Sequence, residues 1–356
     1  MIHSFGWSDA LQRAFEPFAV RGLVPGRIAV QQRGLFILVT DLGELTSQIS
    51  GRLAHEAPSG GYPAVGDWVA AAARPGEMAA TIQAVLPRRT AFVRKAAHSL
   101  ATEQVVAANV DVAFLVASLN ADFNARRLER YLATAWQSGA RPVVVLTKSD
   151  LAADAPGAVA AAEGLAFGAP VLAVSAVTGE GMQALAAQLK PGETAVLVGS
   201  SGVGKSTLVN ALAGEARMAT AAIREDDAHG RHTTSHRELV LLASGALVLD
   251  TPGMRELGLI DAEAGLSATF EDVEALAQAC RFADCGHGDE PGCAVRQALE
   301  EGRLDPGRWT SFRKLKRELA FQERKEDRQA REAHRRRWIA AGKEGRARMK
   351  AKTRDL

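Results

Sequence analysis

The hydrophobic residues of this chain fall into short runs separated by glycine, proline and small polar residues. Beyond about residue 110 the runs alternate with segments of helical periodicity, near 125–137, 158–163, 181–189 and 205–213. The runs are continuous and rich in Val, Leu and Ala, so we interpret them as buried strands. They lie at 110–117, 142–146, 171–174, 194–198 and 246–249. Strands that alternate with helices indicate a doubly wound α/β sheet with helices on both faces.

The pattern between residues 26 and 89 is different. Short strand-like segments lie at 27–30, 35–39, 68–70 and 80–85, and turns such as Gly60-Gly61 separate them. This spacing predicts a small N-terminal β-barrel. Spacing alone does not separate an OB-fold from an SH3-like barrel. Before the barrel, Leu11, Phe15 and Phe18 have the spacing of a helix, to which the sequence assigns no function.

A complete G-x-x-x-x-G-K-[ST] pattern stands between the predicted strand at 194–198 and a predicted helix. It consists of Gly199, Ser200, Ser201, Gly202, Val203, Gly204 and Lys205 with Ser206, followed by Thr207. Its glycines let the backbone adopt positive φ and turn N–H groups toward phosphate oxygens. Lys205 would reach the β and γ phosphates, and the Ser206 hydroxyl would bind Mg²⁺. A glycine-rich turn that binds nothing is the alternative, but the full pattern in a strand-to-helix context favours a phosphate loop.

Three further motifs also follow predicted strands. Asp250 and Gly253 form a D-x-x-G, in which Asp250 would hold Mg²⁺ through water and the Gly253 amide would contact the γ-phosphate. The motif [NT]-K-x-D is made by Thr147, Lys148, Ser149 and Asp150, and Ser175-Ala176 would give a weak third base contact. The Asp150 carboxylate can pair with the N1 and N2 donors of guanine, which adenine lacks. Each motif alone could be an empty loop, but ligands of open α/β sheets bind where these motifs stand, so together they predict GTP or GDP.

All three cysteines of the chain lie within fourteen residues of one another, as Cys280-x4-Cys285-x-His287-x5-Cys293. Three thiolates and one imidazole make a closed tetrahedral site, typical of structural zinc. A sulfur-rich set prefers Zn²⁺ to Mg²⁺ or Ca²⁺. Three buried free cysteines beside a surface histidine are the alternative, which a polar and glycine-rich segment disfavours.

The order of the nucleotide motifs is unusual, because the base-reading motifs at 147 and 175 precede the phosphate loop at 199. A Ras-like chain has the opposite order, so we infer a circular permutation. With strands before it and a Cys/His cluster after it, the chain resembles the ribosome small-subunit-dependent GTPases of the RsgA/YjeQ family, from about Val24 to its basic C-terminus. The resemblance implies a GTP hydrolase that binds the small (30S) ribosomal subunit and its rRNA and acts in late subunit maturation. Through residues 63–69 it also favours an OB-fold that contacts RNA, although a barrel that only packs on the GTPase domain stays possible.

The polar segment 223–234 has the position of switch I. Thr233 or Thr234 would complete the Mg²⁺ shell, and the sequence does not decide between them. Met254 stands where Ras-like enzymes have a water-orienting glutamine, so we expect slow hydrolysis by the free protein. The resemblance, through the G-R-H-T-T at 230–234, nominates His232 as the catalytic replacement. An exposed loop histidine or an RNA contact is the alternative.

The chain from Arg308 onward carries 18 Lys and Arg against 7 Asp and Glu, whereas the whole chain has a net charge of only +2. Arginines at 335–337 beside Trp338 suit RNA phosphates and stacking, so we expect an RNA-binding extension. A solvated helix and a membrane-surface helix are the alternatives. In the barrel the obvious phosphate partners are few, and they are Arg21, Arg27, Arg33 and Arg52.

We therefore expect a multidomain protein: an N-terminal OB-fold-like barrel (1–95), a central circularly permuted P-loop GTPase domain of α/β class (96–258), an α-helical zinc-binding subdomain (259–310) and a basic helical tail (311–356). No run of 18 apolar residues and no signal sequence is found, and the cysteines do not suggest disulfides. We expect a cytoplasmic monomer with no membrane partner, with one structural Zn²⁺, and with Mg²⁺ bound together with GTP.

Two other functions compete with a 30S-dependent GTPase. The protein could be a GTP-gated RNA-binding protein in which hydrolysis is incidental, or a GTPase that serves a protein client such as a metalloenzyme. Turnover measured alone, with small subunits and with large subunits would separate the three.

Overall fold

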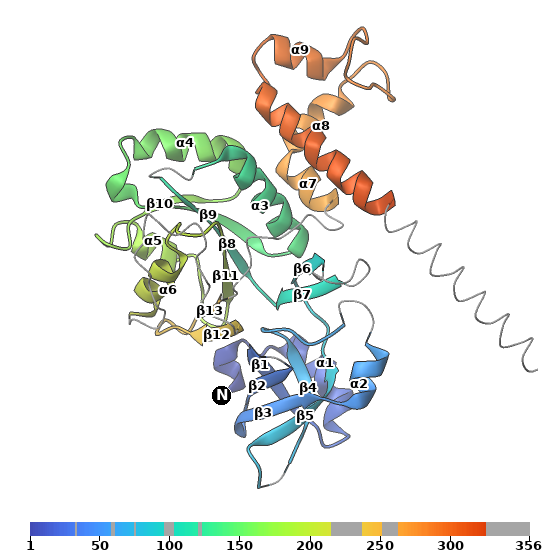
Figure 1. The fold of residues 1–356 in the computed structure, drawn as a ribbon, viewed down its shortest axis with the longest axis vertical. Helices are drawn as coiled ribbons and strands as arrows, with labels where there is room; N and C mark the ends of the chain where they lie inside the picture. Colours follow the sequence, from blue (N-terminus) through green and yellow to red (C-terminus); the bar gives the residue numbers. More distant parts are fainter. Residues whose placement is uncertain are drawn as a thin grey trace, which may run out of the picture.

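The computed structural model of the chain describes residues 1–32, 34–57, 61–74, 76–95, 103–119, 123–214, 237–250 and 263–324. Three regions follow one another in Figure 1: a strand-rich region with the N-terminus, an α/β region and a group of helices. One sheet runs through the first two regions, with its described strands in the order β10-β9-β8-β11-β13-β12-β1-β2-β3-β5-β4. Among the helices in these ranges, none has both the length and the hydrophobicity that a membrane span requires.

The N-terminal region is a closed barrel. Its strands are β1 (Val24–Gln32), β2 (Leu35–Thr40), β3 (Gly43–Ile49), β4 (Trp68–Ala73) and β5 (Ala79–Val85). They follow the order β1-β2-β3-β5-β4, and β4 pairs back onto β1. The β3–β5 pair is parallel, and α2 (Gly51–Glu56) lies between β3 and β4 in the chain. This Greek-key order is that of the OB-fold, so the structure decides the choice that strand spacing leaves open.

A short helix covers the barrel near Trp68. The 3₁₀ turn η1 (Ile2–Phe5) leads into α1 (Asp9–Ala19), which begins where the Ser8 hydroxyl accepts a hydrogen bond from the Leu11 amide. Leu11 and Phe15 are buried together with Trp7 and Trp68, whose rings meet edge to face with centroids 4.9 Å apart. The predicted N-terminal helix is thus confirmed, and its apolar face extends the barrel core.

The α/β region contains the predicted sheet with helices on both faces. Its strands are β8 (Val112–Ser118), β9 (Arg141–Thr147), β10 (Val171–Val174), β11 (Thr194–Val198), β12 (Arg237–Leu241) and β13 (Leu247–Asp250). All neighbouring pairs are parallel except β12–β13. The helices α3 (Ala125–Ser138) and α4 (Ala155–Ala166) pack into one core cluster, and α5 (Met182–Ala186) and α6 (Lys205–Ala213) pack into another. Because parallel strands end at one edge, the predicted nucleotide motifs share that edge.

The barrel and the α/β region are joined through the sheet and through a buried arginine. β12 pairs with β1, with Val30 opposite Glu238. Arg27 of β1 donates to the Asn109 carbonyl and to the Thr194 hydroxyl of β11, at 3.2 and 2.8 Å. Burial lowers the pKa of Arg27 to about 10, which leaves it charged at neutral pH. Its prediction as a phosphate partner is wrong, because the side chain is only 2% exposed.

Between the two regions lies a hairpin of β6 (Ala91–Lys95) and β7 (Glu103–Ala108). Beyond the sheet, α7 (Glu263–Thr269), α8 (Glu271–Gln278), α9 (Ala294–Glu300) and a helix over 306–324 form the third region. Their apolar residues make a separate core with Ala133 of α3, and they include Leu266, Phe270, Val295, Trp309, Phe312, Leu315 and Leu319. The helix over 306–324 continues through residue 310, where the sequence analysis places the boundary between the zinc-binding subdomain and the tail.

Candidate nucleotide and metal sites

The phosphate loop leaves β11 at Gly199 and enters α6 at Lys205. Gly202 and Gly204 have φ of 76° and 94°, which a side chain rarely tolerates. At Gly199 the constraint is space, because an added Cβ would lie 2.4 Å from the Val116 carbonyl oxygen. The Lys205 Nζ donates to the carbonyl oxygens of Gly199 and Ser200 at 2.9 and 2.5 Å. The loop therefore has the strand, glycines, lysine and helix start of a phosphate-binding loop.

The loop after β9 is bonded directly to the phosphate loop. Thr147 is 3% exposed, and its hydroxyl donates to the Val203 carbonyl oxygen at 2.6 Å. The neighbouring Lys148 donates from Nζ to the Gly202 carbonyl oxygen at 3.1 Å. These two bonds fix the base-reading motif against the phosphate loop, although the motifs lie 56 residues apart in the chain. One nucleotide could then contact both.

The loops after β9 and β10 also meet. Asp150 lies in the short turn η2 (Ser149–Leu151) and is exposed. The Ser149 hydroxyl and a carboxylate oxygen of Glu180 are 3.2 Å apart. Ser175 is buried, and its amide donates to the Glu180 carbonyl oxygen at 2.9 Å. The structure thus brings the 147–150 motif and Ser175-Ala176 together. Glu180 is a bridging residue that no motif indicates.

Several predicted residues lie outside the described ranges. They are His232, Thr233, Thr234, Gly253 and Met254, together with Arg33 of the barrel and the predicted RNA contacts at 335–338. Asp250 is described through its backbone, as the last residue of β13, paired with Glu238. Ser206 lies in the first turn of α6, beside Thr207, and Ser201 is exposed at the tip of the phosphate loop.

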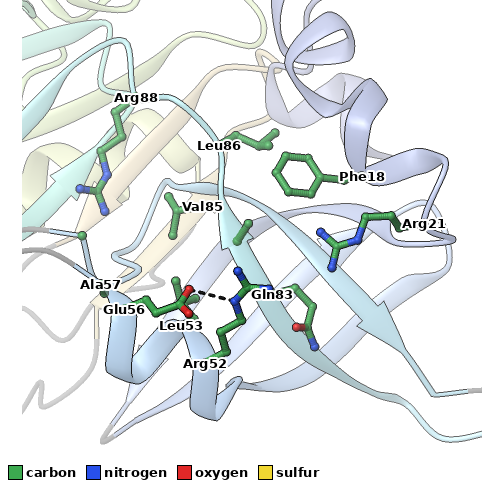
Figure 2. A pocket seen from close by; sticks show the side chains of 12 residues that line it. Phe18, Arg21, Arg52, Leu53, Glu56, Ala57, Gln83, Val85, Leu86 and Arg88 are labelled. Carbon is green, nitrogen blue, oxygen red and sulfur yellow. Dashed lines mark hydrogen bonds and ion pairs between the residues drawn. The ribbon is translucent and has the colours of Figure 1, made fainter.

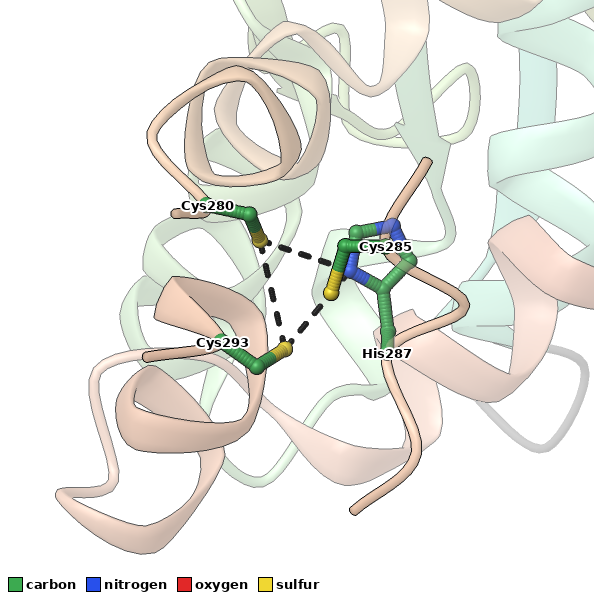
Figure 3. A group of neighbouring side chains, drawn as sticks. All are labelled: Cys280, Cys285, His287 and Cys293. Carbon is green, nitrogen blue, oxygen red and sulfur yellow. Dashed lines mark hydrogen bonds between the residues drawn. The ribbon is translucent and has the colours of Figure 1, made fainter. Parts of the chain in front are cut away.

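The four predicted metal ligands converge in the third region (Figure 3). The Cys280 and Cys293 Sγ atoms lie 3.9 Å apart, and the His287 Nδ1 lies 3.5 and 3.6 Å from them. With Zn–S of about 2.3 Å and Zn–N of about 2.0–2.1 Å, a tetrahedron separates two sulfurs by about 3.8 Å and a sulfur from nitrogen by about 3.5 Å. The observed distances match, and all four ligand atoms lie within 4.8 Å of one another. The cluster could therefore hold a zinc ion.

The surrounding residues hold these ligands in place. The Cys293 Sγ caps α9 by accepting from the Arg296 amide at 3.4 Å. The Glu290 carboxylate accepts from the Gly286 and Gly288 amides, at 2.9 and 2.6 Å, and so braces the loop that carries His287. Burial keeps the pKa of His287 below its usual range, which favours the neutral imidazole that ligates a metal. Trp309 packs edge-on against that ring.

A hollow on the barrel lies between α1, α2 and β5 (Figure 2). Arg21, Arg52 and Arg88 line it together with Phe18. Arg88 is committed to Asp67, with bonds of 2.7 Å to both carboxylate oxygens, whereas Arg52 is exposed and pairs with Glu56. Of the predicted barrel phosphate partners, Arg21 and Arg52 are thus at the surface.

The strand order and the convergent loops define the class of protein: it is a GTPase of circularly permuted topology. A family model described as RsgA GTPase matches residues 85–260. The small ribosomal subunit biogenesis GTPases RsgA of Opitutus terrae and Streptomyces coelicolor are 49% and 45% identical to the chain, covering 99% of it and 99% and 95% of their own lengths. The chain belongs to the RsgA GTPase family.

Solved structures agree with this. YjeQ from Thermotoga maritima is 25% identical, with a TM-score of 0.60 over 84% of this chain and 99% of that one. YloQ, described as a circularly permuted GTPase, is 24% identical with a TM-score of 0.58, covering 86% and 96% of the two chains, and shows the fold alone. The family predicted from the motifs is confirmed.

Proposed function

We propose that this GTPase binds the small ribosomal subunit with its rRNA and couples GTP hydrolysis to late maturation of that subunit in the cytoplasm. Nucleotide binding is supported mainly by the Thr147–Val203 hydrogen bond, which joins the base-reading loop to the phosphate loop. These two loops occur in permuted order along the chain. The partner is supported by relatives that carry the name small ribosomal subunit biogenesis GTPase over nearly the full length of this chain. The rival functions, a passive GTP-gated RNA binder and a GTPase for a protein client, have no comparable support.

In this proposal the nucleotide lies along the carboxyl edge of the sheet. Residues 199–207 cradle the phosphates, Lys205 neutralises the β and γ phosphates, and Ser206 binds Mg²⁺. Asp250 and one of Thr233 and Thr234 complete the magnesium environment. The Asp150 carboxylate accepts from N1 and N2 of guanine, and its exposure leaves it available for this contact. His232 orients the hydrolytic water in the complex with the partner.

The metal cluster has a structural part in this proposal. Three cysteines and one histidine leave no open position on a tetrahedral ion, so bound Zn²⁺ would supply folding energy. Its ligands connect α8, a loop and α9, and Trp309 of the next helix packs on His287. We propose that the zinc subdomain extends beyond residue 310, because the helix over 306–324 supplies Phe312, Leu315 and Leu319 to its core.

Two surfaces suit rRNA phosphates. One is the barrel hollow with Arg21 and Arg52 (Figure 2). The other is a groove on the helix over 306–324, lined by Arg313, Lys314, Arg317 and by Phe321, which is 59% exposed. Cations beside an exposed ring can bind phosphate and stack on a base. The sequence beyond residue 324 adds further positive charge to the C-terminal part of the chain.

The experiment that tests the function measures GTP turnover by the full chain alone, with small subunits and with large subunits. We expect slow turnover alone and strong stimulation by small subunits only. His232→Ala should lose most of the stimulation while GTP affinity and subunit binding persist. Equal turnover in all three mixtures would support the passive RNA binder, and the absence of specific subunit binding would favour a protein client.

A further inference from the structure

The first turn of α3 lies at the same edge of the sheet as the phosphate loop. β8 runs parallel to β11, with Leu115 opposite Val198, so the segments that follow the two strands are neighbours. The helix begins after Asn124, whose side-chain oxygen accepts from the Arg127 amide at 3.0 Å. This cap fixes where the helix starts, and it therefore fixes where Arg127 stands.

Arg127 points from this turn to the phosphate loop. Its Nη1 donates to the Ser200 hydroxyl at 2.6 Å. The carbonyl oxygen of the same Ser200 holds the Lys205 ammonium, at 2.5 Å. Ser200 therefore links the permanently charged guanidinium of Arg127 to Lys205, the lysine that would bind the β and γ phosphates. Arg127 belongs to no nucleotide motif, and nothing in the helical pattern of 125–137 marks it.

The adjoining face of α3 is clamped by the third region. Arg126 pairs with Asp305 at 2.5 Å, and Arg130 pairs with Glu318 at 2.9 Å. Both partners belong to the C-terminal helix or the residue just before it. These two pairs are partly exposed, and together with the buried Arg308–Glu129 pair they hold α3 against the third region.

We propose that Arg127 is a positioning residue of the GTPase reaction, which holds the first turn of the phosphate loop through the Ser200 side chain. The inference rests on the proposed nucleotide-binding role of residues 199–207. Ser200 also anchors Lys205, so its displacement would disturb the contact with the γ-phosphate more than contacts made by GDP. The Arg127 guanidinium thereby increases the preference for GTP over GDP. Because ion pairs join α3 to the third region, this preference also depends on the position of the zinc subdomain.

The test compares dissociation constants for GDP and for a non-hydrolysable GTP analogue in full-length Arg127→Ala and Arg127→Lys. We expect Arg127→Ala to weaken the GTP analogue about tenfold, as for loss of one charge-assisted hydrogen bond. GDP affinity should change by less than about threefold, and Arg127→Lys should lie between the wild type and Arg127→Ala. Arg141→Ala is the matched control, because Arg141 stands at the opposite end of β9 and donates to the Gln188 carbonyl oxygen.

A double-mutant cycle with Ser200→Ala separates positioning from general destabilisation. If Arg127 acts through Ser200, the double variant should be no weaker in GTP binding than Arg127→Ala alone. Equal loss of GTP and GDP affinity, additive effects, or no effect of Arg127→Ala would overturn the proposal. Lys205→Ala tests the underlying assignment independently: if that variant still binds both nucleotides normally, the phosphate loop itself has been misassigned, whatever Arg127→Ala does.

Discussion

Arg308 of the C-terminal helix and Glu129 of α3 form an ion pair of 3.3 Å, with side chains 5% and 0% exposed. The same guanidinium donates to both carboxylate oxygens of Asp272, at 2.7 and 2.8 Å, and lies over the Phe270 ring. One side chain thereby connects the GTPase domain to two helices of the zinc subdomain. The two parts are held together by a buried, specific joint as well as by apolar packing.

Replacing Arg308 should lower the free energy of unfolding substantially. We expect Arg308→Leu to destabilise the protein by about 3 kcal/mol, because Asp272 would lose two charge-assisted hydrogen bonds and the buried Glu129 would keep only the partly exposed Arg126 as an ionic partner. Chemical unfolding followed by circular dichroism measures this. Arg303→Leu is the control, since Arg303 is 54% exposed in its pair with Glu301 and should cost less than about 1 kcal/mol. Similar losses for both variants would show that the joint contributes nothing special.

The same joint predicts a pH dependence. Burial raises the pKa of Glu129, so the folded protein binds this proton more tightly than the unfolded chain does. Its contribution to stability is complete below the ordinary glutamate pKa of about 4.3 and is lost as pH rises through the raised value. Glu129→Gln removes this loss, so the variant should gain stability relative to the wild type between pH 4 and 7. If the difference in unfolding free energy between Glu129→Gln and the wild type stays constant over this range, the pKa of Glu129 is not raised in the folded protein.

Thr147 offers a test of the bond between the two nucleotide loops. Thr147→Val keeps the shape but removes the hydroxyl that donates to the Val203 carbonyl oxygen. Because this bond holds the base-reading loop against the phosphate loop before nucleotide binds, its loss should cost preorganisation, and we expect guanine nucleotide affinity to fall about tenfold. Titration of a fluorescent GDP measures it. Thr46→Val, which changes an exposed residue of the barrel strand β3, should leave the affinity unchanged.

Base recognition can be tested by changing the donor and acceptor pattern at Asp150. Asp150→Asn should shift preference from guanosine to xanthosine nucleotides, because the amide complements the altered base edge. Competition between GTP and XTP provides the measurement. Asp154→Asn, at the N-cap of α4, is the control and should keep guanine preference. An unaltered preference for GTP in Asp150→Asn would remove Asp150 from the base site.

Metal removal should act locally. Chelation or Cys285→Ser should unfold the region around 280–293 and change the fluorescence of Trp309, whose ring centroid lies 5.4 Å from that of His287. GDP affinity should persist, since the nucleotide loops belong to other elements. Asp289→Ser changes a fully exposed neighbour and should retain the metal, as measured by elemental analysis. Parallel loss of metal and nucleotide binding would mean that the two units are not separable.

Local pattern was sufficient for much of the fold. The continuous apolar runs predict β8, β9, β10, β11 and β13, and the loops that follow β9, β10 and β11 meet as expected. Cys280, Cys285, His287 and Cys293 could be grouped because ligand spacing is itself a sequence property. The polar strand β3 and the β6–β7 hairpin were missed, since their residues alternate weakly or lie in a segment interpreted as a connector.

The sequence pattern does not reveal contacts between residues that are far apart in the chain. Arg27 looks like a surface cation in the sequence, yet it is buried where β1 meets β11. Arg127 and Glu129 look like ordinary solvated helix residues in the sequence, and only the structure shows that they contact Ser200 and Arg308. Periodicity predicts which side of a helix or strand is buried, but it does not predict which charged residue from a distant part of the chain contacts that side.

The pairing of β1 with β12 also has a consequence for synthesis. Arg237 Nη1 donates to the Gln31 side-chain oxygen across 206 residues of chain. At about 5–20 residues per second, the barrel strand would wait roughly 10–40 s for its partner to be translated. During that interval the end of β1 at Val30 and Gln31 lacks its partner β12, whereas β2 and β4 already close the rest of the barrel. The sheet that unites the barrel with the α/β region is therefore completed only after β12 has been translated, long after the barrel strands themselves are available to pair.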